Sequence, residues 1–111
     1  MGERQEAREA GHLYHKLVRV SSRPEIWVYL GASRDYVMVD RRYCSCPSFT
    51  YSISRGESPR CKHLDGLPAV VSAGKYRDLT SVLKRDEVAS IIMEVMILGF
   101  SGKIREVLFS R

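Results

Sequence analysis

Two short pairs of metal-ligating residues constrain this chain more than any other feature of its sequence. A Cys-x-Cys pair, Cys44 and Cys46, is followed by a Cys-x-His pair, Cys61 and His63. Three thiolates and one imidazole form a complete tetrahedral ligand set for zinc, and sulfur ligands disfavour magnesium and calcium. Binding of this kind contributes on the order of 10 kcal/mol to the folding of small zinc domains. The pattern therefore predicts one structural zinc ion bound by Cys44, Cys46, Cys61 and His63.

Two other interpretations of these residues remain open at this point. The cysteines could be buried thiols and the histidine a core residue, because free cysteine is among the most often buried residue types. Cys44 and Cys46 could instead form a redox pair, although the more familiar redox spacing is Cys-x-x-Cys. Neither alternative explains why the four residues occur as two pairs.

The length and composition fit a single soluble domain. The 111 residues suit one core, and a chain with 44% hydrophobic and 28% charged residues is ordinary for a globular protein. No apolar run approaches the roughly 18 residues of a membrane span, and the charged start lacks the apolar region of a signal peptide. We expect no membrane association and an intracellular location, cytoplasmic in a prokaryote or nuclear in a eukaryote.

The strand pattern centres on one hairpin. Residues 26–30 and 36–39 are β-branched and aromatic runs that flank a glycine-containing loop, and residues 16–21 indicate a short additional strand. Both faces of the hairpin are apolar. One face is therefore expected to contact a helix, and the other to be covered or to await a partner.

Helices are expected around and after the metal ligands. Pro47, directly after Cys46, predicts the start of a short helix, and Ser58 with Pro59 predicts the cap and start of the helix that carries Cys61 and His63. Pro68 is expected to break or kink that helix, because proline removes a backbone donor.

Two further helices are expected towards the end of the chain. Asp86 predicts the cap of a longer helix that ends at Gly99, and residues 104–109 predict a short last one. The expected fold class is α+β: a small antiparallel sheet of two to three strands, a zinc-anchored helix and additional C-terminal helices. We expect one domain over residues 1–111, with a zinc-binding core over 26–73, a flexible N-terminus over 1–10 and a helical part over 80–109.

The residues around the ligands resemble the SWIM-type zinc finger. The run Tyr-Cys-Ser-Cys-Pro-Ser-Phe-Thr-Tyr-Ser, the later Cys-Lys-His-Leu and the upstream Trp-Val-Tyr-Leu-Gly-Ala-Ser are similar to the small SWIM-domain subunit of Shu-type recombination complexes. The resemblance covers roughly residues 16–96 and is strongest over 26–64. At Asp65-Gly66-Leu67-Pro68 the chain departs from the apolar helix that relatives tend to continue.

The resemblance implies both a fold and a role. It implies a ββα unit in which two strands lead into the first cysteine pair and a helix carries the second pair, with the four residues above as zinc ligands and Phe49 as a core residue under the metal loop. It also implies a non-catalytic accessory protein that binds a RecA-family recombinase paralogue and supports homologous recombination DNA repair.

An enzymatic role is disfavoured by the residues themselves. A catalytic zinc normally keeps one coordination position open, whereas this chain offers four ligands at motif spacing. No glycine-rich phosphate loop is present, so any ATP chemistry would belong to a partner. We expect no catalytic residues, no bound organic cofactor and no small-molecule substrate.

Basic and aromatic residues suggest a second function, a free-standing DNA-binding zinc module. The net charge is +5, which favours nucleic acid or an acidic partner. Basic residues surround the metal segment, and they could contact phosphates or form a solvated basic rim; they are Arg41, Arg42, Arg55, Arg60 and Lys62. Trp27, Tyr29 and Tyr36 could stack on single-stranded bases or pack against a helix. DNA could be contacted directly or through the protein partner.

The longer C-terminal helix carries a broad apolar stripe. Its members are spaced at helical intervals and could complete the core or fit a groove on a partner protein; they are Val88, Ile91, Ile92, Val95 and Met96. So wide a stripe on so short a chain favours a hetero-complex, because surplus apolar surface needs to be covered.

Overall fold

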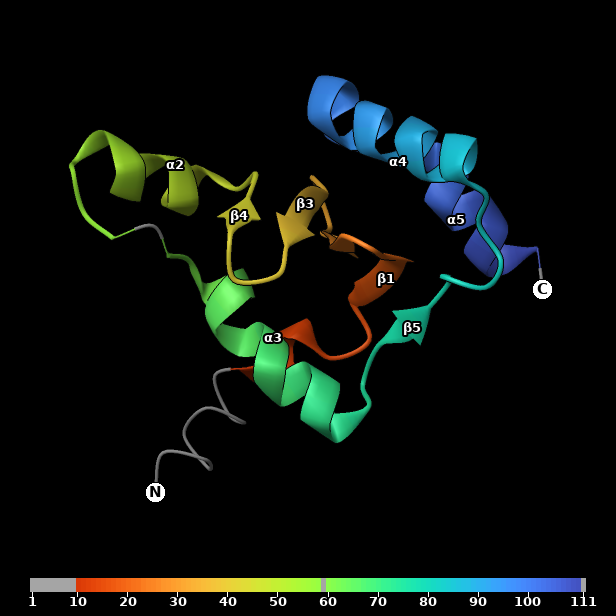
Figure 1. The fold of residues 1–111 in the computed structure, drawn as a ribbon, viewed down its shortest axis with the longest axis horizontal. Coiled ribbons are helices and arrows are strands. Elements are labelled where there is room, and N and C mark those ends of the chain that lie inside the picture. The colour runs from red at the N-terminus through yellow and green to blue at the C-terminus, as the bar shows by residue number, and fades with distance from the viewer. Residues whose placement is uncertain (1–9, 59, 111) are drawn as a thin grey trace.

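The fold is a mixed sheet with helices on both sides (Figure 1). The computed structural model describes residues 10–58 and 60–110. In chain order the elements are η1 (Gly11–Leu13), a 3-10 helix, then β1 (Leu17–Ser22), β2 (Glu25–Tyr29), β3 (Tyr36–Val39), β4 (Tyr43–Cys44), α2 (Pro47–Ser54), α3 (Lys62–Ala73), β5 (Arg77–Asp78), α4 (Arg85–Leu98) and α5 (Gly102–Phe109). The predicted α+β class is confirmed.

The sheet has five strands, and the prediction of two to three strands is wrong. Its order is β4-β3-β2-β1-β5, with antiparallel neighbours except for the parallel pair of β1 and β5. The predicted hairpin is the antiparallel pair of β2 and β3. The unpredicted strands β4 and β5 are two residues long. Segments this short carry no periodic pattern, because they are extended only through pairing with a neighbouring strand.

Successive residues of the central strands point into two different cores. Leu17, Trp27 and Met38 belong to a cluster with α3, η1 and the three cysteines. Their neighbours Val18, Val28 and Val37 belong to a second cluster, which includes Ile91 and Val95 of α4, Ile104 and Leu108 of α5, and Leu79. Figure 1 shows α3 on one side of the sheet and α4 with α5 on the other. The second apolar face of the hairpin is therefore covered by the chain's own helices.

Helix α3 begins later than predicted, because Cys61, one of the predicted metal ligands, provides its cap. The N-cap is Cys61, whose Sγ accepts a hydrogen bond of 3.5 Å from the backbone N–H of Leu64. Ser58 is exposed and precedes the helix, so its predicted capping role is wrong. Pro59 lies outside the described residues.

Helix α3 also runs through Pro68, where the sequence predicted a break or kink in the helix. It continues to Ala73 and ends at Gly74, whose φ of 67° suits glycine. Pro68 is exposed, so water can bond to the carbonyl group that proline leaves without a donor. The neighbouring Gly66 is buried, and a Cβ there would lie 2.6 Å from Cδ1 of Leu13. The departure from the apolar pattern thus lets η1 pack closely against α3.

Two predicted details of the remaining helices need correction. The N-cap of α4 is Lys84, whose N–H donates 3.0 Å to the carboxylate of Glu87, and Asp86 lies in the first turn instead. The predicted end at Gly99 and the last helix are both confirmed. Of the N-terminal segment predicted to be flexible, residues 1–9 lie outside the described residues, and Ala10 is fully buried.

One buried ion pair joins the loop between β2 and β3 to the C-terminal helices. The Asp35 carboxylate accepts two hydrogen bonds from the Arg105 guanidinium, at 2.7 and 2.9 Å. It also accepts from the backbone N–H of Ser101 at 2.9 Å and of Gly31 at 3.3 Å. Four donors therefore hold this side chain, which is completely inaccessible to solvent.

Candidate metal centre

The four predicted ligands converge on one point. One ligand atom from each of Cys44, Cys46, Cys61 and His63 lies within 4.8 Å of the others, and all four side chains are buried. The Sγ of Cys44 and the Nδ1 of His63 are 3.8 Å apart. In a tetrahedral site with a zinc–sulfur bond of about 2.3 Å and a zinc–nitrogen bond of about 2.0 Å, the sulfur and nitrogen atoms lie about 3.5 Å apart. The donor set and its spacing thus fit one metal ion, plausibly zinc.

Three elements bring these ligands together. Cys44 ends β4, Cys46 is the N-cap of α2, Cys61 is the N-cap of α3, and His63 follows in the first turn of α3. The N-terminus of a helix carries a partial positive charge that stabilises a nearby thiolate. Two helices therefore begin at the metal centre with their positive ends towards the sulfur atoms.

The three thiols influence one another strongly. Hydrogen bonding to Cys61, with burial second, raises the pKa of Cys44, and burial raises the pKa of Cys46. The hydrogen bond with Cys44 lowers the pKa of Cys61 to about 4. Because the pKa values of Cys44 and Cys46 are raised, a metal ion that binds at neutral pH must displace their protons.

Zinc affinity should depend steeply on pH as a result. Two thiols whose pKa is raised lose their protons when zinc binds. The zinc association constant should therefore rise about 100-fold per pH unit between about pH 7 and pH 8. Cys61 adds nothing in this range, since its pKa is about 4. Competition with a chromophoric chelator at fixed ionic strength measures this slope. A zinc association constant that does not change with pH would exclude thiol ligands. Release of three protons for each zinc ion bound would show that Cys61 is also protonated before binding.

Aromatic rings enclose the histidine side of the centre. The ring of His63 lies 4.5 Å from that of Tyr29 and 5.4 Å from that of Tyr36, and the two tyrosine rings stack at 6.0 Å. Phe49, the aromatic expected under the metal loop, is buried in the same core and contacts Tyr43 edge-on at 5.4 Å. These contacts fix the orientation of the imidazole and exclude water from the ligands.

The five basic residues predicted for nucleic acid are all exposed, with different surroundings. Arg55 pairs with Glu57 at 3.2 Å, and Arg60 pairs with Asp65 at 3.0 Å. Arg41, Arg42 and Lys62 form no ion pair within the part of the chain that the structure describes. Three of the five cations thus remain available to an external anion.

The fold places Tyr29 and Tyr36 against each other and Trp27 apart from them. Trp27 is buried, and its ring lies 5.0 Å from that of Tyr76. Tyr29 is half-buried against His63. Tyr36 also contacts His63 but lines an open groove as well. Helix and core packing therefore accounts for Trp27, and Tyr36 remains accessible to a ligand.

The apolar stripe on α4 is divided between the core and the surface. Ile91 and Val95 are buried, Val88 and Ile92 pack against the same core, and Met96 is 52% exposed. Met93, Ile97 and Leu98 are more exposed than any residue of the predicted set. Together with Met96 and Phe100 they form what we term the α4 apolar surface. Helical spacing alone could not show which side of so broad a stripe faces the sheet.

Neither a membrane-spanning helix nor a relationship to a known protein was found for the described part of the chain. None of the helices within residues 10–58 and 60–110 has both the length and the hydropathy needed to cross a bilayer. No model of a known protein family matches this chain, and comparisons with curated proteins and with solved structures return no significant match.

Proposed function

We propose that this chain is a non-catalytic, zinc-stabilised accessory subunit that binds a RecA-family recombinase paralogue and supports homologous recombination DNA repair. The observation that carries the proposal is the closed ligand set, in which Cys44, Cys46, Cys61 and His63 are buried within 4.8 Å of one another. Four protein ligands leave no position for a substrate, so the ion is structural.

The SWIM assignment within this proposal has support from the order of the elements. Strands β2, β3 and β4 lead into the first cysteine pair, and α3 carries the second pair. This order matches the ββα unit that the resemblance implies. The recombinase paralogue follows from the same resemblance, through the residues that flank the ligands.

The α4 apolar surface offers a place for such a partner. Ile97 and Leu98 are each 70% exposed, and Met93 is 58% exposed. Exposed apolar side chains gathered at one helix end are typical of protein interaction sites. A protein partner that covers them would remove this surface from water.

Co-purification tests the proposal. The full chain, tagged and expressed in its source cell, should recover a RecA-family ATPase at a fixed ratio, and the two purified proteins should re-form the complex. Ile97→Asp with Leu98→Asp should reduce recovery at least about tenfold, because two charges would be buried in an apolar interface. Ile53→Asp, at a similarly exposed position on α2, is the matched control and should leave recovery unchanged. Equal recovery with both variants, or a partner without a RecA fold, would refute the proposal.

A second candidate function is a free-standing DNA-binding zinc module. The net charge of +5 and the exposed Arg41, Arg42 and Lys62, which form no ion pair among the described residues, favour it. Contacts of this kind give affinity that falls steeply with added salt and needs no protein partner. Titration of the purified chain with labelled DNA at two salt concentrations distinguishes the two functions.

A further inference from the structure

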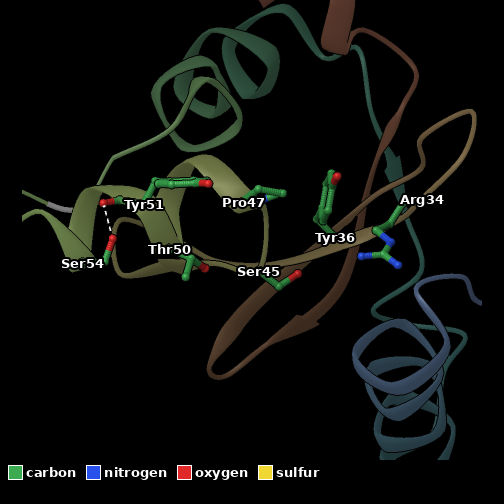
Figure 2. Close-up of a pocket in the computed structure, with 7 residues that line it drawn as sticks. All are labelled: Arg34, Tyr36, Ser45, Pro47, Thr50, Tyr51 and Ser54. Carbon is green, nitrogen blue, oxygen red and sulfur yellow. Dashed lines mark hydrogen bonds between the residues drawn. The ribbon is translucent and has the colours of Figure 1, made fainter.

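A surface groove lies beside the metal loop. It has a volume of about 330 Å³, and Figure 2 shows its side chains in a row from Ser54 and Tyr51 on α2 to Arg34 at the other end. Ser45 and Tyr36 lie between these ends. The same Arg34, Tyr36 and Ser45 line a smaller adjoining hollow of about 150 Å³ that reaches Gly99. The second hollow is also lined by Asp35, whose carboxylate pairs with Arg105.

The groove combines aromatic rings, hydroxyl groups and a cation. Tyr51 is 63% exposed, and the guanidinium of Arg55 lies 5.8 Å from its ring centre. Arg34 is exposed and forms no hydrogen bond or ion pair with any other described residue. None of the seven described residues that line the groove is acidic. Arg55 also pairs with Glu57 at 3.2 Å, whereas Arg34 pairs with no carboxylate among the described residues. The groove therefore offers flat apolar faces and, at Arg34, an unpaired positive charge.

The metal centre holds one wall of this groove in place. Ser45 lies between the ligands Cys44 and Cys46, and its hydroxyl accepts a hydrogen bond of 2.9 Å from the backbone N–H of Val37. The ring of Tyr36 lies 5.4 Å from that of the ligand His63. Residues on a rigid scaffold lose little conformational entropy on binding. The groove is thus formed before a ligand arrives.

We infer that this groove binds single-stranded nucleic acid, with bases stacked on Tyr51 and Tyr36 and phosphates near Arg34 and Arg55. Such binding combines a basic groove with aromatic platforms for successive bases. A duplex keeps its bases stacked on one another and cannot present them to the rings. A proline-rich peptide would use the rings but leave the cations without a role. The inference goes beyond docking on a protein partner and narrows the DNA-binding candidate to one strand at one site.

Fluorescence anisotropy with the zinc-loaded full chain tests this inference. The probes are labelled oligo(dT), oligo(U), a duplex of equal length and a proline-rich peptide. Single strands should bind more tightly than the duplex or the peptide; tighter binding of oligo(dT) assigns DNA as the ligand, and tighter binding of oligo(U) assigns RNA. Preference for the duplex or the peptide would overturn the inference.

Variants with matched controls locate the site. Tyr51→Ala should weaken binding at least about fivefold, whereas Tyr51→Phe, which keeps the ring, should bind nearly as the parent does. Arg34→Gln should lower the slope of log affinity against log salt by about 0.7. Arg77→Gln removes an equal charge from exposed β5 and should leave the slope unchanged. Tyr51 is mostly exposed, so its truncation spares the core.

The experiments distinguish failure of the groove inference from failure of either proposed function. If Tyr51→Ala and Arg34→Gln bind as the parent does while Arg41→Gln with Arg42→Gln binds weakly, the groove inference is overturned and the basic module remains. Absence of any single-strand binding overturns the groove inference and leaves the co-purification result unaffected.

Discussion

Cys61→Ala should abolish zinc binding and unfold the segment over residues 41–73. Cys61 is both a candidate ligand and the N-cap of α3, so its loss removes a metal bond and the Sγ that accepts from Leu64. Zinc coordination contributes on the order of 10 kcal/mol in small zinc domains, whereas whole domains are stable by only about 5–15 kcal/mol. The remaining ligands cannot compensate for a loss of that size.

Two readouts report this loss from different parts of the molecule. Circular dichroism should show the loss of α2 and α3. The single tryptophan, Trp27, is buried in the same core as the three cysteines, so its fluorescence should shift towards that of an exposed indole. Lys62→Ala changes an exposed neighbour and should melt as the parent does. A metal-free Cys61→Ala protein with unchanged melting would contradict a structural role for zinc.

Asp35→Ala should give the next largest loss of stability. The substitution leaves the Ser101 N–H without its acceptor, and it leaves the Arg105 guanidinium with only the carbonyl oxygen of Ser101 among the described residues. Breaking one side of a buried ion pair costs about 3–5 kcal/mol. Because Arg105 keeps 22% of its side chain exposed, we expect about 3 kcal/mol, which corresponds to a fall in Tm of more than about 10 °C.

Thermal and urea denaturation measure the effect of Asp35→Ala. Asp35→Asn keeps an acceptor for Arg105 and should lose less stability than the alanine variant. Asp86→Ala removes an exposed carboxylate from the first turn of α4 and should cost less than about 1 kcal/mol. If Asp35→Ala and Asp86→Ala melt alike, the pair with Arg105 contributes little to stability.

The metal ligands and the central hairpin could be predicted because their determinants are local. Four residues at motif spacing define the ligand set, and two apolar runs around a loop define β2 and β3. The ends of the helices could be predicted less well from the sequence. Ser58 is a good intrinsic cap, but the tertiary position of Cys61 at the metal centre places the start of α3 there instead.

Contacts between distant segments left no trace in the sequence pattern. Asp35 and Arg105 are separated by 70 positions, and neither stands out before the chain is folded. The groove has the same origin, since Arg34 and Tyr51 come from separate segments. An exposed tyrosine on a short helix was the available signal, and it became meaningful only once the fold placed Arg34 in the same groove.

Strand β2 lies between β1 and β3, and helices pack against both of its faces, which restricts how the chain can change. Trp27 fits beneath α3, whereas Val28 fits beneath α4 and α5. A one-residue insertion upstream of Trp27 would turn the strand over and present the indole to helices shaped around valine. Insertions can therefore be accommodated in the loops. A single residue added within β2 would instead turn its side chains towards the wrong helices on both faces of the sheet.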